Sequence, residues 1–368
     1  MVKKMDLIFC RMSYVVRLNA LALASLTIKY KIHLTTFLLL FQTTFLFSQD
    51  IHFSQIQETP LWLNPANAGF FTGKFRATAN YRSQWQSMGN PYQTISVSVD
   101  VLATKSKKSN IGIGLFVFND KAGVAKLGST QAQLHVNAII KSGRKSKLAG
   151  GIYAGYSQFS ANYAALTFAN QYNGTGIEQS IASGENISNN SMSNFDVGAG
   201  VNYELALSKQ TIARNESSSF KIGFAVHHIN RPTQRYNPFT DDRMRMRFTG
   251  NIQARIDFEG SKFSVLPSIV YLRQAKAQEI ILGTHIRYRL KNGTKITGNI
   301  TETAFQVGLY YRINDAIVPQ ISLDLGKYAV GVCYDLNLSK YTAVSKAQGA
   351  MEFYLKFILA EQALFKRK

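Results

Sequence analysis

Long stretches of this chain alternate between apolar and polar side chains with a period of two residues. In the stretch 131–140, with the sequence QAQLHVNAII, every even-numbered residue is apolar and nearly every odd-numbered one is polar. A period of two is the signature of a β-strand whose two faces meet different surroundings. Most of the 368-residue chain shows this pattern, so we expect strands to dominate the fold.

The predicted strands have the length of membrane-crossing segments. About fourteen are expected, at 75–85, 94–101, 110–119, 131–140, 146–160, 193–208, 218–228, 243–258, 261–272, 276–290, 301–313, 316–325, 327–338 and 349–359. Lengths of roughly 9–16 residues suit tilted transmembrane strands, whereas strands in soluble proteins most often have about 5–6 residues.

The two faces of these strands favour a membrane barrel over a soluble sandwich. One face is apolar throughout, as lipid requires, and the other carries arginines along its length, which suits a watery lumen. Only a closed barrel satisfies all backbone groups of a sheet inside a bilayer. The sequence therefore predicts an all-β fold, a single antiparallel transmembrane outer-membrane β-barrel of about fourteen strands.

An export signal precedes the strands. Lys29 and Lys31 come before the mostly apolar stretch 34–47 (LTTFLLLFQTTFLF), and the small residue Ser48 follows it. This order is the pattern of a secretory signal peptide. The stretch 1–28 that precedes this pattern is unusually long for a signal peptide. We interpret it as an extension that results from a start codon assigned upstream of the real one.

The chain is thus expected to have four parts. These are a signal peptide with its extension (1–48), a periplasmic plug or docking segment (49–73), the barrel (74–359) and a C-terminal tail (360–368). The segment 49–73 is too polar for a strand, but Phe53, Trp62, Leu63 and Phe70 require burial. We expect it to fold into the periplasmic mouth, and an ordinary tail packed on the barrel is the alternative.

The connections between strands predict the orientation in the outer membrane. An even strand number places both termini in the periplasm, and the two longest connections, 161–192 and 229–242, then face outward as in bacterial barrels. The protein is therefore expected to be integral, with extracellular loops and periplasmic termini. Pro267 and Pro319 argue against the strand boundaries around them, because proline cannot donate to a sheet.

The charge of +21 suggests nucleic acid as a partner, but the distribution of charge argues against it. Most basic residues stand singly at alternate strand positions, and no nucleic-acid motif or basic helix occurs. Export argues against nucleic acid as well. A basic surface close to anionic lipid is the better interpretation.

Motifs for catalysis, cofactors or metals are missing, so an enzyme is not expected. There is no catalytic elbow, zinc-protease motif or phosphate-binding loop, and two cysteines, Cys10 and Cys333, cannot build a zinc site. His227 and His228 are adjacent, so on a strand they would point to opposite faces. The glycine pairs Gly112/Gly114 and Gly198/Gly200 are expected to allow close packing rather than to bind phosphate.

A column of arginines lines the polar face of the predicted strand 243–258. It consists of Arg243, Arg245, Arg247 and Arg255. One interpretation is that the column attracts an anionic solute or an acidic polypeptide to the barrel mouth. The interpretation we favour is structural, with pairing to lumen acids such as Asp100, Asp196, Glu204 and Asp324.

An ordered set of short motifs resembles a known family. The set comprises Phe53-Ser54-Gln55, Asn64-Pro65-Ala66 with Gly69, Tyr81-Arg82 with Gln84-Trp85, His228 with Arg231-Pro232-Thr233, Tyr334-Asp335 through Ser339, and Gly349 to Leu355 with Glu352. It resembles the PorP/SprF family of type IX secretion system membrane proteins from Bacteroidetes. The N-terminal extension and Met351, where we expect His, depart from the family pattern. Partner docking is predicted for the signature residues Asn64, Pro65, Ala66, Gly69, Arg82 and Trp85.

The resemblance implies a non-enzymatic outer-membrane protein that serves type IX secretion or gliding motility. Such a protein would assist the export or surface anchoring of a partner such as an adhesin, by handling its C-terminal sorting domain. The implied partners are this secreted protein, periplasmic components of the system and outer-membrane lipid, with no cofactor. A general porin or small-solute channel is the alternative function.

Overall fold

The structure is a computed structural model that describes residues 50–86, 89–104, 106, 108–143, 145–184, 191–207, 218–234, 242–291, 302–339, 342 and 347–359. The chain divides into two compact units, Met1–Ser48 and Gln49–Lys368, and every described residue belongs to the second. The predicted signal peptide and C-terminal tail lie outside the described residues.

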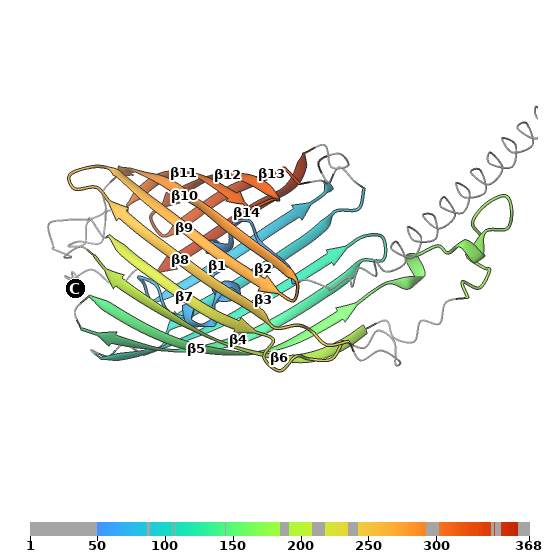
Figure 1. The fold of residues 1–368 in the computed structure, drawn as a ribbon, viewed down its shortest axis with the longest axis horizontal. Helices are drawn as coiled ribbons and strands as arrows, with labels where there is room; N and C mark the ends of the chain where they lie inside the picture. Colours follow the sequence, from blue (N-terminus) through green and yellow to red (C-terminus); the bar gives the residue numbers. More distant parts are fainter. Residues whose placement is uncertain are drawn as a thin grey trace, which may run out of the picture. The chain divides into compact units, whose positions relative to one another are not determined.

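Fourteen strands form one closed barrel in which each strand pairs antiparallel with its sequence neighbours (Figure 1). They are β1 (Phe75–Gln84), β2 (Tyr92–Leu102), β3 (Ser109–Ala122), β4 (Leu127–Ser142), β5 (Ser146–Ser160), β6 (Ser191–Ala206), β7 (Ser219–His227), β8 (Arg247–Asp257), β9 (Phe263–Gln274), β10 (Ala277–Lys291), β11 (Thr303–Arg312), β12 (Ala316–Leu325), β13 (Tyr328–Asn337) and β14 (Gln348–Leu359). The pairing of β1 with β14 closes the ring. The predicted fold is confirmed.

The prolines do not interrupt the predicted strands, whereas one predicted strand begins later than expected. Pro267 and Pro319 lie inside β9 and β12, each at a point where the pairing with one neighbouring strand is interrupted, so neither proline ends its strand. The strand predicted from Arg243 begins only at Arg247, since Arg243 forms an isolated bridge with Thr233.

The two faces of the wall have the expected polarity. Along β4, Leu134 and Val136 are exposed on the outside, while Gln133, His135 and Asn137 are buried on the inside. This arrangement, the reverse of that in a soluble protein, suits a barrel surrounded by lipid. None of the helices in the described part of the chain is long and apolar enough to cross a bilayer.

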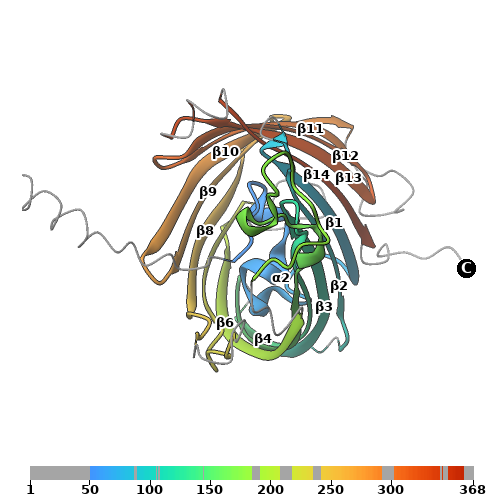
Figure 2. The same cartoon turned by 90° about the vertical axis from the view of Figure 1, so that its right-hand side faces the viewer.

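Residues 50–73, here called the inner segment, lie inside the barrel. The segment contains the short helices η1 (Ile56–Glu58), α2 (Pro60–Leu63) and η2 (Pro65–Asn67), and Figure 2 shows it in blue within the ring of strands. Its apolar side chains pack against inward-facing wall residues in three clusters, centred on Ile56 and Leu63, on Phe53, Leu61 and Trp62, and on Ala66 and Phe70. The inner segment therefore supplies much of the hydrophobic core.

The inner segment runs from one end of the barrel to the other. Asp50 bonds to Gln274 at the β9–β10 turn, the end that also carries the β5–β6 and β7–β8 connections and is called the long-loop end. Lys74 bonds to Leu359 at the opposite end, where β1 begins. Asp50 and Leu359 thus lie at opposite ends of the barrel, and the periplasmic location of both termini stays a prediction.

Candidate functional site

The Asn-Pro-Ala motif fixes the inner segment to the middle of the wall. Asn64 is fully buried, and its Oδ1 accepts a hydrogen bond from the backbone N–H of Ala66 at 2.9 Å, which caps η2. Its Nδ2 donates to the backbone carbonyls of Val201 in β6 (3.1 Å) and Phe224 in β7 (3.3 Å). Pro65 begins η2, where its missing N–H leaves no bond unmade. The motif therefore joins a tight turn to two neighbouring strands.

Glycines in the wall allow this turn to approach the strands. A Cβ atom at Gly151 in β5 would lie only 2.7 Å from backbone atoms of Pro65 and Ala66. A Cβ atom at Gly112 in β3 would overlap the backbone carbonyl of Ala68. The close packing that the sequence predicted for Gly112 is confirmed, and its partner is the inner segment.

Gly69 anchors the end of the motif near the start of β1. Its φ of +67° favours glycine, and its N–H donates to Asp100 at 2.8 Å. The same carboxylate pairs with Arg76 at 2.8 Å, and Arg76 also donates to the backbone carbonyl of Asn67. An ion pair of the wall therefore holds the backbone of the inner segment.

Arg82 performs the corresponding role nearer the long-loop end. It is buried, and its guanidinium lies 2.6 Å from Ser54 Oγ, 3.0 Å from Asp335 and 3.3 Å from Glu352. Arg312 donates to the same carboxylate of Asp335 at 2.9 Å. Two arginines and two carboxylates therefore compensate one another in the interior, as buried charges require.

Trp85 stands apart from the other signature residues. It follows β1 at the long-loop end with a φ of +59°, and its half-buried ring meets Tyr92 edge-on at 5.2 Å between centroids. The structure thus brings Asn64, Pro65, Ala66 and Gly69 together inside the barrel, and Arg82 binds the same segment at Ser54. Partner docking by these residues stays a prediction.

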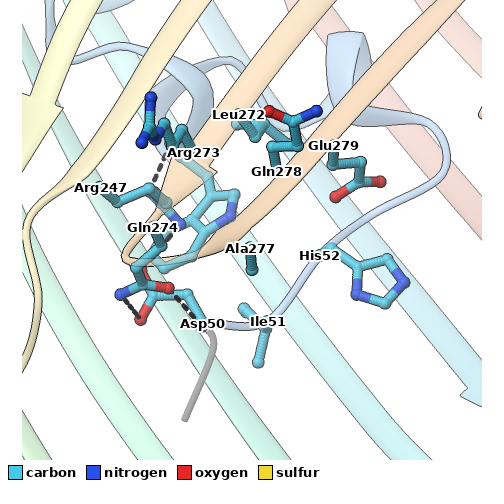
Figure 3. Close-up of a pocket in the computed structure, with 11 residues that line it drawn as sticks. Asp50, Ile51, His52, Arg247, Leu272, Arg273, Gln274, Ala277, Gln278 and Glu279 are labelled. Carbon is cyan, nitrogen blue, oxygen red and sulfur yellow. Dashed lines mark hydrogen bonds and ion pairs between the residues drawn. The ribbon is translucent and has the colours of Figure 1, made fainter. Parts of the chain in front are cut away.

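A cavity of about 210 Å³ opens beside Asp50 at the long-loop end (Figure 3). Its lining includes Trp62, Gln274 and Glu279. The Asp50 carboxylate lies 2.6 Å from Nε2 of His228 and 3.1 Å from Arg247, and it accepts a hydrogen bond from Gln274 Nε2 at 3.2 Å. No pattern in the sequence pointed to Asp50, because all of its partners lie more than 170 positions away.

The charges beside this cavity shift the pKa values of its acids and bases. Burial alone would lower the pKa of His228, but Asp50 and Asp196 stabilise the imidazolium and raise the pKa to about 9. Burial would raise the pKa of Asp50, but His228 and Arg247 hold it well below its usual value. Burial and the nearby Arg82 lower the pKa of His52, which stays neutral. The cavity therefore contains a fixed cation–anion pair.

The structure separates the predicted arginine column. Arg243 and Arg245 precede β8 and are exposed, whereas Arg247 is buried against Asp50 and Trp62. Arg255 pairs with Asp257 at 2.9 Å. The partners of Arg247 and Arg255 are thus not those we expected, since the acids we had proposed pair elsewhere, with Arg76, His228, Lys147 and Arg287.

The expectation that His227 and His228 point to opposite faces is wrong. Both side chains are buried, because β7 ends at His227 and the φ of +56° at His228 turns the next side chain back inward. In the part of the chain that the structure describes, no three His, Cys, Asp or Glu side chains are grouped as a metal ion would require.

The solved structures to which this chain is similar include channels and transporters. The CymD monoaromatic hydrocarbon channel is 11% identical with a TM-score of 0.42, and the match covers 83% of this chain and 93% of that one. A Pseudomonas aeruginosa FadL homologue is 11% identical (TM-score 0.42, 80% and 92% covered), and the P. putida toluene transporter TodX is 9% identical (TM-score 0.42, 81% and 93% covered). Likenesses of this degree say nothing of function. No curated protein matches the chain.

A family model covers most of the chain. The model described as type IX secretion system membrane protein PorP/SprF matches residues 45–357. This range includes the inner segment and the whole barrel except for the last two residues of β14. Family and barrel together place the protein in the outer membrane. The chain therefore belongs to the PorP/SprF family of type IX secretion system membrane proteins.

Proposed function

We propose that this protein is a non-enzymatic outer-membrane component of type IX secretion that assists the export or surface anchoring of a partner protein such as an adhesin. Family membership supports the general role in secretion. The proposal that the protein assists a partner rests on the inner segment. This segment occupies the lumen, and nearly all of its side chains from Phe53 to Phe70 are buried. A lumen filled in this way favours a protein that binds partners over a general diffusion pore.

The β5–β6 connection is the surface that we propose for contact with the exported protein. Its tip is ordered by a bridge between Tyr172 and Ile177, and Oδ1 of Asn173 accepts hydrogen bonds from the N–H groups of Thr175 and Gly176. Tyr172 and Ile177 are more than half exposed. Exposed aromatic and aliphatic side chains on a firm turn are suited to binding a protein surface.

In this proposal the long-loop end faces outward, and the end where β1 begins meets periplasmic components of the secretion system. The ligand would be the C-terminal sorting domain of the secreted protein, and lipid would surround the wall. No catalytic step is involved.

A deletion strain tests this function. Surface proteins are labelled with a membrane-impermeant biotin reagent, and we expect the loss of the protein to strand at least one secreted protein inside the cell. The full chain should restore display, whereas Tyr172→Ser with Ile177→Ser should restore it poorly although the barrel assembles. Unchanged surface display in the deletion strain would contradict the proposal.

Conductance distinguishes the porin alternative. The mature chain in a planar bilayer should show no stable conductance steps, whereas a variant lacking 50–73 should conduct if it assembles, because a barrel of this strand number then has an open lumen. Stable steps from the complete mature chain would favour the porin.

A further inference from the structure

The Asp50 carboxylate is held by side chains from three separate parts of the wall. His228 follows β7, Arg247 begins β8 and Gln274 ends β9, and their nitrogens lie 2.6, 3.1 and 3.2 Å from the carboxylate oxygens. Two of the three groups are cationic when His228 is protonated. Bonds of this kind between cations and a carboxylate are among the strong hydrogen bonds of proteins.

Contacts beyond Asp50 fix these groups in place. Arg247 stacks on the Trp62 ring at 3.7 Å and donates to the Trp62 carbonyl at 3.1 Å. The other ring nitrogen of His228 lies 2.9 Å from Asp196, whose carboxylate accepts a hydrogen bond from Tyr153 at 2.8 Å. Arg247 and His228 are almost completely buried. Contacts with Trp62 and Asp196 therefore position Arg247 and His228 independently of Asp50.

Gln274 makes the site selective for an aspartate within a polypeptide. Its Nε2 donates to the Asp50 carboxylate, while its Oε1 accepts the backbone N–H of the same residue at 2.8 Å. A free anion offers no N–H group for the second bond. The adjoining cavity, which Ile51 and Leu272 line, leaves space for the residue that follows the aspartate.

We infer that the site formed by Arg247, His228 and Gln274 is a receptor for an acidic polypeptide segment, occupied by Asp50 of the same chain until a partner's aspartate replaces it. Replacement would release Asp50 and Ile51, because the next two residues have anchors of their own: His52 lies 3.1 Å from the Arg82 guanidinium, and Phe53 is buried beside Leu61 and Trp62. The partner's identity as the exported protein rests on the proposed function. The site itself is tested on purified protein, so either proposal can fail alone.

The first experiment measures how firmly Asp50 holds its end of the inner segment. Ile51→Cys is introduced into the full chain carrying Cys10→Ser and labelled with a maleimide, since the remaining cysteine, Cys333, is buried. Adding Asp50→Asn or Arg247→Gln should raise the labelling rate roughly tenfold, as expected for losing a charge-assisted bond. Heat-modifiable gel mobility confirms that each variant is folded. Equal rates in the folded variants would overturn the inference.

The second experiment tests occupancy by another chain. The probe is a fluorescent tetrapeptide with the sequence of residues 49–52, blocked at both ends, added to the full chain carrying Asp50→Asn. It should bind roughly tenfold more tightly than the same peptide with Asn in place of Asp. A further Arg247→Gln change should abolish the difference, whereas Lys126→Gln, in the exposed β3–β4 turn at the same end, should not. Equal binding of the two peptides, or no binding of either, would overturn the inference.

Discussion

Arg82 and Glu352 are directly opposite each other in the pairing of β1 with β14, and both also bind Ser54 of the inner segment. Arg82 donates to Ser54 Oγ at 2.6 Å, and Glu352 accepts the Ser54 N–H at 2.8 Å. The strands that close the barrel therefore share their charged groups with the segment inside it. Closure of the wall and docking of the segment depend on the same side chains.

Arg82→Gln should destabilise the barrel strongly. It leaves Asp335 and Glu352 buried with less compensating charge, a change that costs about 3–5 kcal/mol in other buried ion pairs. The free energy of unfolding in urea measures the effect. Lys147→Gln is the control, because the Lys147–Glu204 pair is partly exposed and should cost less than about 1 kcal/mol. Equal costs would mean that the buried cluster does not stabilise the fold.

Two neighbouring glycines of β5 test the fit of the inner segment. Gly151→Ala should cost about 1–3 kcal/mol, because the added methyl group would meet the backbone of Pro65 and Ala66. Gly150→Ala, on the outer face with nothing within 4 Å, should be close to neutral. Limited proteolysis should cut the inner segment faster in the first variant only. Similar cleavage in both would show that the segment is held elsewhere.

Val136→Arg tests the outward face of the wall. Val136 is exposed in the middle of β4, and an arginine facing lipid near the bilayer centre costs about 2–4 kcal/mol. Val124→Arg, in the exposed β3–β4 turn, should cost at most about 1 kcal/mol. Assembly into lipid vesicles and unfolding in urea provide the comparison. Equal destabilisation by the two substitutions would mean that Val136 does not face lipid.

His228 should make stability depend on pH. Its pKa rises from 6.5 to about 9 on folding, so its contribution is complete below about pH 6.5 and is lost as the pH rises through about 9. The loss should reach at most about 3.4 kcal/mol. The groups around it are Asp50, Asp196, Arg247, His227 and Tyr153.

His228→Gln is the control for this pH dependence. It should remove most of the difference between the unfolding free energies at pH 6.5 and pH 9.5, while other titrating groups affect both proteins equally. The low pKa of Asp50 keeps its carboxylate ionised throughout this range. A wild-type protein whose stability does not fall across the range would contradict the assignment.

The barrel could be predicted from the sequence because lipid imposes the same requirement on every strand. The alternation in β5 and β12 gave both strands their full observed lengths, 146–160 and 316–325. The start of β8 at Arg247 could not be predicted in this way, since the alternation already begins at Arg243, in the loop that precedes the strand. A side-chain pattern cannot show where hydrogen bonding between strands ends.

The contacts of the inner segment could not be predicted, because they depend on the closed barrel. Phe53, Trp62 and Phe70 indicated burial, but the direction of the segment is set by distant partners such as Gln274 for Asp50 and Glu352 for Ser54. The pairing of His228 depends on a single backbone angle. Neither the contacts of the inner segment nor the pairing of His228 produces a repeating pattern of apolar and polar residues in the sequence.

The bond between Ser54 and Glu352 joins residues 298 positions apart, and this separation has a consequence for assembly. Contacts between the first and last parts of a chain form slowly, since a long loop must close before they contribute. Until β14 is in place, Phe53, Trp62 and Phe70 lack the enclosed barrel that buries them, and exposed apolar surface of this kind promotes aggregation. We therefore expect the unfinished protein to depend on a chaperone for longer than a barrel whose core comes from adjacent strands.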